Sequence, residues 1–253
     1  MNKYDDMKDY SKLAKFIFYF VEITLIASVI IIGYFIVKAP TEVAADAPSY
    51  VHPKAYYTLM LVESIVGVIA CTLAKRVQGV IHIPSYMLIP FVIFLYCAIF
   101  LGEVRQFYYQ VPNWDTFLHF FSAGMLGCLA FSLISILNQS KSVPIDLSPA
   151  FIAIFAFCFA AAIGMLWEIY EFSFDGLLGL NMQKFMLEDG TQLIGRAALE
   201  DTMKDIITDV SGAGIVAIVG YIAMKNHDKG WLNRLQLHFK QKHANKENKA
   251  NKK

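Results

Sequence analysis

Six long apolar runs constrain the fold of this chain more than any other feature. Each has about 20 residues with few charges, which is the length an α-helix needs to cross the hydrocarbon core of a bilayer. A segment inside lipid must satisfy its own backbone N–H and C=O groups, so runs of this length predict helices. The runs cover approximately residues 16–37, 55–74, 84–102, 115–137, 149–172 and 201–224. We therefore expect an all-α, polytopic integral membrane protein with six transmembrane helices.

Composition agrees with a membrane protein, because 57% of the side chains are apolar and 17% are charged. The four cysteines fall in four different apolar runs, which excludes a disulfide framework and a CxxC metal knuckle. We find no nucleotide-binding loop and no nucleophile motif, so the sequence supports no particular reaction and leaves organic cofactors open. We expect no nucleic-acid partner. The bilayer is the partner that composition predicts, and the oligomeric state is left open.

The first run has an alternative interpretation as a secretory signal peptide, because Ala45-Asp46-Ala47 imitates a cleavage site. However, its apolar core is longer than the roughly 7–15 residues of a signal peptide, and Pro48 would follow the cut. We therefore interpret residues 16–37 as a spanning helix.

The distribution of basic residues predicts the orientation in the membrane. Residues 1–15, the loops after the second and fourth runs, and residues 225–253 lie on one side. Together they carry more Lys and Arg than the loops on the other side, with or without the tail. The positive-inside rule then gives a basic cytoplasmic N-terminus and a basic cytoplasmic tail, which becomes low-complexity and is expected to be partly disordered. We expect a multi-pass protein of the cell membrane.

Counting the crossings brings acidic side chains from distant parts of the chain to one leaflet, the outer one in this orientation. The fourth and sixth runs begin on that side and the fifth run ends there. The candidate site residues at these helix ends are Asp115, His119, Glu168, Glu171, Asp201, Asp205 and Asp209. Glu103, Arg105 and Asp175 lie just beyond the helix ends on the same side. This co-location holds for either orientation, because it depends only on the number of crossings.

The spacings favour convergence of these side chains. Asp115 and His119 are four residues apart, and Asp201 begins an i, i+4, i+8 stripe about 12 Å long. Glycine, alanine and serine flank the acidic positions in all three runs, and small residues let transmembrane helices approach closely. We expect the fourth, fifth and sixth helices to pack with their acids turned inward.

So many carboxylates around one histidine cannot all stay ionised without cations or protons. Oxygen ligands with a single imidazole favour a hard divalent ion, Mg²⁺ or Mn²⁺ over Zn²⁺ or Fe²⁺. All seven candidate residues are possible ligands, and Asp115, His119, Glu168 and Glu171 are also candidate acid–base groups. Arg105 and Arg196 are candidates for holding an anionic group such as a phosphate.

Simpler interpretations exist for several of these residues. Asp115 and Asp201 are also where helix-capping acids belong, and a lone membrane histidine often only hydrogen-bonds a neighbouring helix. The whole set could also be solvated helix ends. Glu22 and Glu63 are single intramembrane acids that could pair with each other or with tyrosine hydroxyls, and we assign them no role.

The 28 residues 173–200 are long for a passive connection. They are compatible with a lid, a re-entrant segment or an interfacial helix.

Three motifs, WDTFLHFFSAG, GMLWEIYEFSFD and DTMKDIITDVSGAG, together resemble the YjdF-like group of bacterial membrane-spanning proteins over about residues 85–225. The resemblance implies a fold of several helices and no particular reaction, because the group is functionally uncharacterised. The spacing of the last motif is also similar in part to CDP-alcohol phosphotransferases. In this chain, however, Thr191 to Ile194 replace the residues that such enzymes need after Asp-Gly, and Asp201 replaces a glycine. A prenyltransferase would need a second Asp-rich motif, and the fourth run offers only Asp115 and His119.

Three functional hypotheses follow. The first is a divalent-metal-dependent hydrolase or transferase that acts on a lipid or a lipid-linked phosphate at the outer leaflet. The second is a cation or proton-coupled transporter that uses the same acids. The third is a structural or partner-binding membrane protein whose acids only cap and pair.

Overall fold

The computed structural model describes residues 11–42, 52–138, 147–187, 190–226 and 238–239. Within these residues, six helical segments are long and apolar enough to cross a membrane, which confirms the all-α, polytopic class. The long elements are α1 (Lys12–Lys38), α2 (Lys54–Gln78), α3 (Ser85–Leu95) with a π-helix directly after it (Tyr96–Val104), α5 (Trp114–Asn138), α6 (Pro149–Leu178) and α7 (Glu200–Lys225). The short elements are α4 (Phe107–Gln110), a 3-10 turn (Ala197–Leu199) and the strands β1 (Ile81–His82) and β2 (His238–Phe239).

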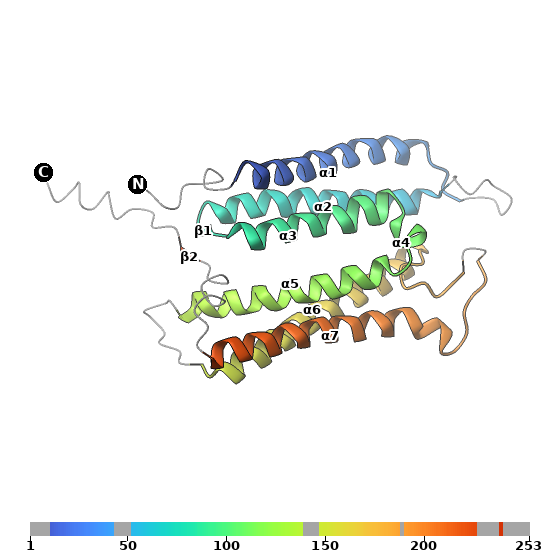
Figure 1. Ribbon diagram of the computed structural model, residues 1–253. Coiled ribbons are helices and arrows are strands. Elements are labelled where there is room, and N and C mark those ends of the chain that lie inside the picture. Colours follow the sequence, from blue (N-terminus) through green and yellow to red (C-terminus); the bar gives the residue numbers. More distant parts are fainter. Residues whose placement is uncertain (1–10, 43–51, 139–146, 188–189, 227–237, 240–253) are drawn as a thin grey trace, which may run out of the picture.

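The helices form two groups of three that lie side by side (Figure 1). One group contains α1, α2 and α3, and the other contains α5, α6 and α7, which pack closely against one another. The start of α1 and the end of α7 lie at the same end of the molecule, where β1 and β2 pair in antiparallel register. The starts of α5 and α7 and the end of α6 lie at the opposite end, as the number of crossings requires. Residues 1–10 and most of the tail fall outside the described residues.

Local sequence signals set several helix ends. The Ser11 side chain accepts the N–H of Ala14 at the start of α1, and the Ser148 side chain accepts the N–H of Phe151 at the start of α6. Both contacts satisfy N–H groups that have no partner inside the helix. α6 ends at Gly179, whose φ of 64° is the left-handed conformation that glycine adopts without a Cβ penalty. The sequence predicted this end near residue 172, and the helix continues to Leu178.

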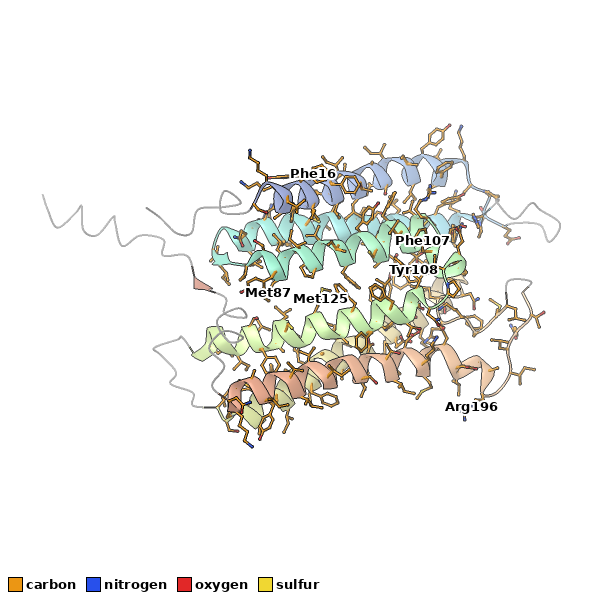
Figure 2. The ribbon with its side chains drawn as sticks, in the orientation of Figure 1. Phe16, Met87, Phe107, Tyr108, Met125 and Arg196 are labelled. Carbon is orange, nitrogen blue, oxygen red and sulfur yellow. The ribbon has the colours of Figure 1, made fainter. Side chains whose placement is uncertain are left out.

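Each three-helix group has its own apolar core. In the first group the core includes Phe18, Leu25, Cys71 and Val92. In the second it is built around smaller side chains, such as Ala130 and Ala156, together with Phe131. The groups meet through α3 and α5, where Met87 and Met125 lie in the space between them (Figure 2) and the Ser132 hydroxyl contacts the Met87 sulfur at 3.7 Å. All four cysteines are free.

The third span is irregular in its C-terminal half. Pro90 lies inside α3, and the helix changes to a π-helix six residues later, at Tyr96. The indole Nε1 of Trp114 donates to the Cys97 carbonyl at 3.3 Å, so this segment also anchors the start of α5. π-Helical segments are rare and occur mostly near functional sites. No periodicity in the sequence predicted one here.

We expect the contact between α5 and α7 to depend on Gly212. A Cβ at this position would lie 2.9 Å from the Phe120 carbonyl oxygen and 3.1 Å from the Ala123 Cβ, so Gly212→Ala must push the two helices apart. Overpacking of this kind costs about 1–3 kcal/mol, and thermal unfolding of the protein in detergent should show a lower Tm.

Gly214→Ala is the matched control, because a Cβ there would meet only Phe157 at 3.8 Å, an ordinary contact. Both substitutions gain the same helix propensity, so Gly214→Ala should leave the Tm unchanged or raise it. Equal destabilisation by the two substitutions would show that the helices do not pack as described.

Candidate metal centre

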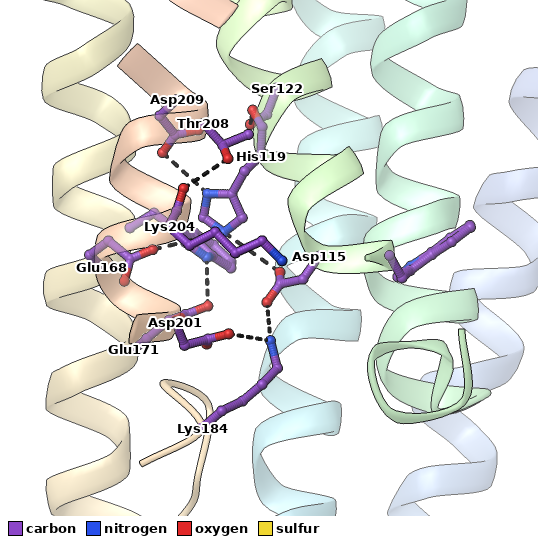
Figure 3. Close-up of polar contacts among 12 residues, drawn as sticks. Asp115, His119, Ser122, Glu168, Glu171, Lys184, Asp201, Lys204, Thr208 and Asp209 are labelled. Atoms are coloured by element: carbon purple, nitrogen blue, oxygen red, sulfur yellow. Dashed lines mark hydrogen bonds and ion pairs between the residues drawn. The ribbon is translucent and has the colours of Figure 1, made fainter. Parts of the chain in front are cut away.

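The acidic residues predicted from the sequence meet between α5, α6 and α7, at the end of the bundle where α5 and α7 begin and α6 ends (Figure 3). Asp115 and His119 lie one turn apart on α5, and Glu168 and Glu171 on the last part of α6. Asp201, Asp205 and Asp209 follow one another along the first turns of α7. The side chains at positions 119, 168, 171, 205 and 209 are buried, so the acids are not simply solvated helix ends.

His119 is at the centre of the group. Its Nδ1 lies 3.2 Å from Asp209 Oδ2, a hydrogen-bonding distance. Its Nε2 faces Asp115 Oδ1 at 3.6 Å and Glu168 Oε1 at 3.8 Å. The imidazole therefore contacts carboxylates from all three helices. One ring nitrogen is held by a carboxylate, and the other is directed toward two more.

Glycine makes room for this arrangement. A Cβ on Gly164 of α6 would overlap the Asp209 carboxylate, including its Cγ at 2.7 Å. Only glycine therefore lets Asp209 lie between α6 and His119 without a shift. The small residues that the sequence showed near the acids are thus used to place a buried carboxylate as well as to bring helices together.

Three side chains form a candidate ligand set for one ion. Asp115, His119 and Asp205 each offer a ligand atom, and these atoms lie within 4.8 Å of one another. Ligand atoms that share a Mg²⁺ at about 2.1 Å are at most about 4.2 Å apart, on opposite sides of the metal. The three ligand atoms would therefore draw closer together around a shared ion.

Several buried carboxylate oxygens in the cluster lack a hydrogen-bond partner, which suits the binding of a cation. Among the residues that the structure describes, both oxygens of Glu168, Oδ2 of Asp201 and Oδ1 of Asp205 are buried without a hydrogen-bond partner. Glu168 and Asp205 are only 5% and 2% exposed. A buried carboxylate oxygen with no partner costs free energy, and a bound cation removes that cost.

Lys184 is the cation that the sequence analysis missed. Its Nζ lies 2.5 Å from Asp115 Oδ2 and 3.0 Å from Asp201 Oδ1, so it joins α5 to α7. Burial works to lower the pKa of Lys184, but the two carboxylates outweigh burial and raise the pKa above its ordinary value. Arg105 and Arg196, the cations predicted from the sequence, are exposed, and no ion pair joins either to the described carboxylates.

The loop that carries Lys184 has a defined conformation. Asp175, in the last turn of α6, accepts the backbone N–H groups of Met182 and Gln183 at 2.7 and 3.0 Å. These bonds turn the chain back toward α7, and Lys184 itself has a φ of 48°, in the left-handed region. Asp175 is therefore a structural residue that positions the lysine. The sequence showed Asp175 only as an acid close to a helix C-terminus, which does not predict its bonds to the loop.

The connection from α6 to α7 is not an interfacial helix. In its described part, the N–H of Leu193 bonds to the Phe185 carbonyl, and that of Leu187 bonds to the Thr191 carbonyl, so the chain doubles back on itself. Helical structure resumes only at the 3-10 turn before α7. Of the three possibilities left open by the sequence, the interfacial helix is wrong.

Two other intramembrane acids have partners outside the cluster. Glu22 of α1 pairs with Lys75 of α2 at 2.5 Å. Glu63 of α2 accepts a hydrogen bond from the Tyr170 hydroxyl of α6 at 3.2 Å, which links the two helix groups. Of the two alternatives that the sequence left open, a tyrosine hydroxyl is the partner of Glu63, and Glu22 pairs with a lysine instead of with Glu63.

Comparisons with known proteins agree with the membrane fold. Residues 19–226 match the model of the family described as "Predicted membrane protein (DUF2238)". An "Uncharacterized protein" from Thermotoga maritima is 30% identical over 122 residues, which is 48% of this chain and 54% of that protein. The chain thus matches about half the length of that relative. No solved structure matches.

These matches agree with the YjdF-like resemblance, because both indicate a membrane family with no assigned activity. The family model covers all six spans except the first turns of α1. The chain belongs to the DUF2238 family of membrane proteins.

Proposed function

We propose that this protein is a divalent-metal-dependent hydrolase or transferase that acts on a lipid or a lipid-linked phosphate. The observation that carries the proposal is the convergence of Asp115, His119 and Asp205, with an unpartnered, buried Asp205 oxygen among them. Mg²⁺ or Mn²⁺ suits this set better than Zn²⁺ or Fe²⁺, because carboxylate oxygens outnumber the single imidazole.

The chain's own residues suggest a division of roles. His119 would bind the ion through Nε2, because its Nδ1 is held by Asp209, the usual arrangement for a metal-bound histidine. Glu168 lies 3.8 Å from that Nε2 and has no hydrogen-bond partner among the described residues, so it can accept or hold a proton. Lys184 supplies a fixed positive charge at the edge of the site. When bound, the ion would act as a Lewis acid that polarises a phosphoryl oxygen.

Transport of a cation or a proton is less well supported. A transport path must continue from the cluster toward the other side of the membrane, and Glu63 and Glu22 are the acids available for it. Glu22 is already neutralised by Lys75, and Glu63 is hydrogen-bonded to Tyr170. We therefore favour an enzyme over a transporter. A purely structural protein would have no use for unpartnered buried carboxylates.

We place the cluster at the outer face of the bacterial plasma membrane, with both termini inside, from the distribution of Lys and Arg. This orientation gives the site access to substrates in the outer leaflet.

Metal binding is the first test. Purified wild-type protein should retain Mn²⁺ on gel filtration, and its Tm should fall on chelation. Asp205→Asn and His119→Ala should each raise the Kd for Mn²⁺ by at least about tenfold, because each removes a ligand. Glu200→Gln is the matched control, since Glu200 begins the same helix but is exposed.

Loss of binding in the Glu200→Gln control, or equal binding in all four proteins, would contradict the assignment of the ligands. No bound metal and no effect of chelation in the wild type would refute the metal-dependent function.

Lys184 gives an independent prediction. Lys184→Gln leaves Asp115 and Asp201 without their counter-charge, so the metal-free protein should unfold about 2–8 °C lower, as a loss of roughly 1–2 kcal/mol implies for a chain of this size. Mn²⁺ should raise the Tm of this variant more than that of the wild type, because it replaces the missing charge.

Lys204→Gln is the control, because Lys204 is exposed and its ammonium group bonds only to the Asn113 side chain among the described residues. Thermal unfolding with Mn²⁺ and with a chelator separates the two variants. Identical Tm values for both would mean that Lys184 does not compensate the cluster.

Sidedness is tested by cysteine labelling in intact cells, in a background with the four native cysteines replaced by alanine. Thr41→Cys, exposed after α1, should react with a membrane-impermeant maleimide. Asn226→Cys, just after α7, should react only after the membrane is permeabilised. The reverse pattern would place the cluster in the cytoplasmic leaflet.

A further inference from the structure

A groove of about 440 Å³ lies between α5 and α7 at the outer end of the bundle. Three of its lining residues are large and apolar: Phe117, Phe120 and Ile207 are 53%, 45% and 60% exposed. Thr208 and Ser211 also line it. The groove is not part of the cluster described above, because the ligand set Asp115, His119 and Asp205 is absent from its lining.

The groove lies beside the line along which α5 and α7 pack together, and glycines bring the two helices close at several positions on that line. One of these positions is Gly212, where a Cβ would approach the Phe120 carbonyl and Ala123. From the neighbouring Ser211 the groove follows α7 outward to Ile207 and α5 outward to Asn113. Along α7, the distance from Ser211 to Lys204 at the outer end is seven residues, or about 10 Å.

The position of the groove determines the kind of occupant. Both helices are long and apolar enough to cross a membrane, so we expect the exposed side chains between them to face lipid. The hydroxyls of Thr208 and Ser211 donate to carbonyls of their own helix at 2.8 and 2.7 Å. The wall therefore carries hydroxyl groups whose hydrogens are already used, and it can contact hydrocarbon without leaving a donor unsatisfied.

A positive charge lies at the outer end of the groove. The exposed Lys204 donates to the Asn113 side chain at 3.2 Å, which holds the ammonium group beside the start of α5. An ammonium group of this kind binds phosphate as a point charge. Lys204 is the residue directly before Asp205, and Phe120 directly follows His119, so the groove and the cluster use adjacent faces of the same two helices.

We propose that this groove holds the hydrocarbon chain of a bilayer lipid that carries a phosphate monoester, with the phosphate at the Lys204 end beside the cluster. The choice of a phosphate rests on the proposed function and on the charge of Lys204. The choice of a lipid chain rests on the groove alone. The lipid enters sideways from the outer leaflet, between α5 and α7.

The test uses phosphatidic acid with a photoreactive diazirine in its acyl chain, mixed into phosphatidylcholine vesicles that contain the full-length protein. After irradiation, mass spectrometry should find the label concentrated on groove residues such as Phe120 and Ile207. Ser211→Trp, which fills the groove, should reduce that labelling by about tenfold. Val219→Trp is the matched control, because Val219 is 48% exposed on the same helix and does not line the groove.

The same experiment with a photoreactive phosphatidylcholine tests the contribution of the head group. The wild type should be labelled more strongly by phosphatidic acid than by phosphatidylcholine, and Lys204→Gln should remove this preference. Labelling spread over all lipid-facing residues in proportion to their exposure would overturn the proposal, as would equal labelling of Ser211→Trp and the wild type.

Mn²⁺ binding by the same proteins separates this inference from the proposed function. If the protein binds metal but the lipid labels no particular residues, only the proposed lipid site is refuted. Specific labelling without metal binding would refute the metal-dependent function and leave the lipid site in place. Ser211→Trp should bind Mn²⁺ like the wild type, which also shows that it is folded.

Discussion

Carboxylates from three membrane-spanning helices surround one imidazole. The packing of α5, α6 and α7 depends on how the negative charge of these carboxylates is compensated. His119 contacts Asp115, Glu168 and Asp209, and Lys184 reaches in from a loop to join Asp115 to Asp201. These contacts leave buried oxygens of Glu168 and Asp205 without a hydrogen bond among the described residues. Because burying charge without a partner is costly, these carboxyl groups must take up protons or a cation, and the proposed metal ion is such a cation.

Close helix packing is the other condition for this site. Gly164 leaves room for the Asp209 carboxylate, and Gly212 lets α7 approach the backbone of α5. The first contact brings a ligand-orienting group to His119. The second lies next to Ser211, which lines the groove between α5 and α7. The same small residues thus position a polar site inside the bundle and an apolar surface outside it.

The sequence was sufficient to predict the six spans, because long apolar runs have few alternatives in a membrane. It also predicted the convergence of Asp115, His119 and the α7 acids, because the number of crossings and the helical period determine the leaflet and the helix face. It did not predict Lys184, since the path of a loop depends on contacts such as those made by Asp175. Nor did it separate Asp205, in the ligand set, from Asp209, which holds the imidazole, because both lie on one helix face.

The most direct measurement is anomalous diffraction at the manganese edge from crystals of the wild-type protein grown with Mn²⁺. The site described above predicts one strong peak at coordination distance from Asp115, His119 and Asp205, with the Asp209 carboxylate still bonded to the other nitrogen of the imidazole. A map with no peak in the cluster, or with manganese only at exposed acids such as Glu200, would contradict a metal centre between α5, α6 and α7.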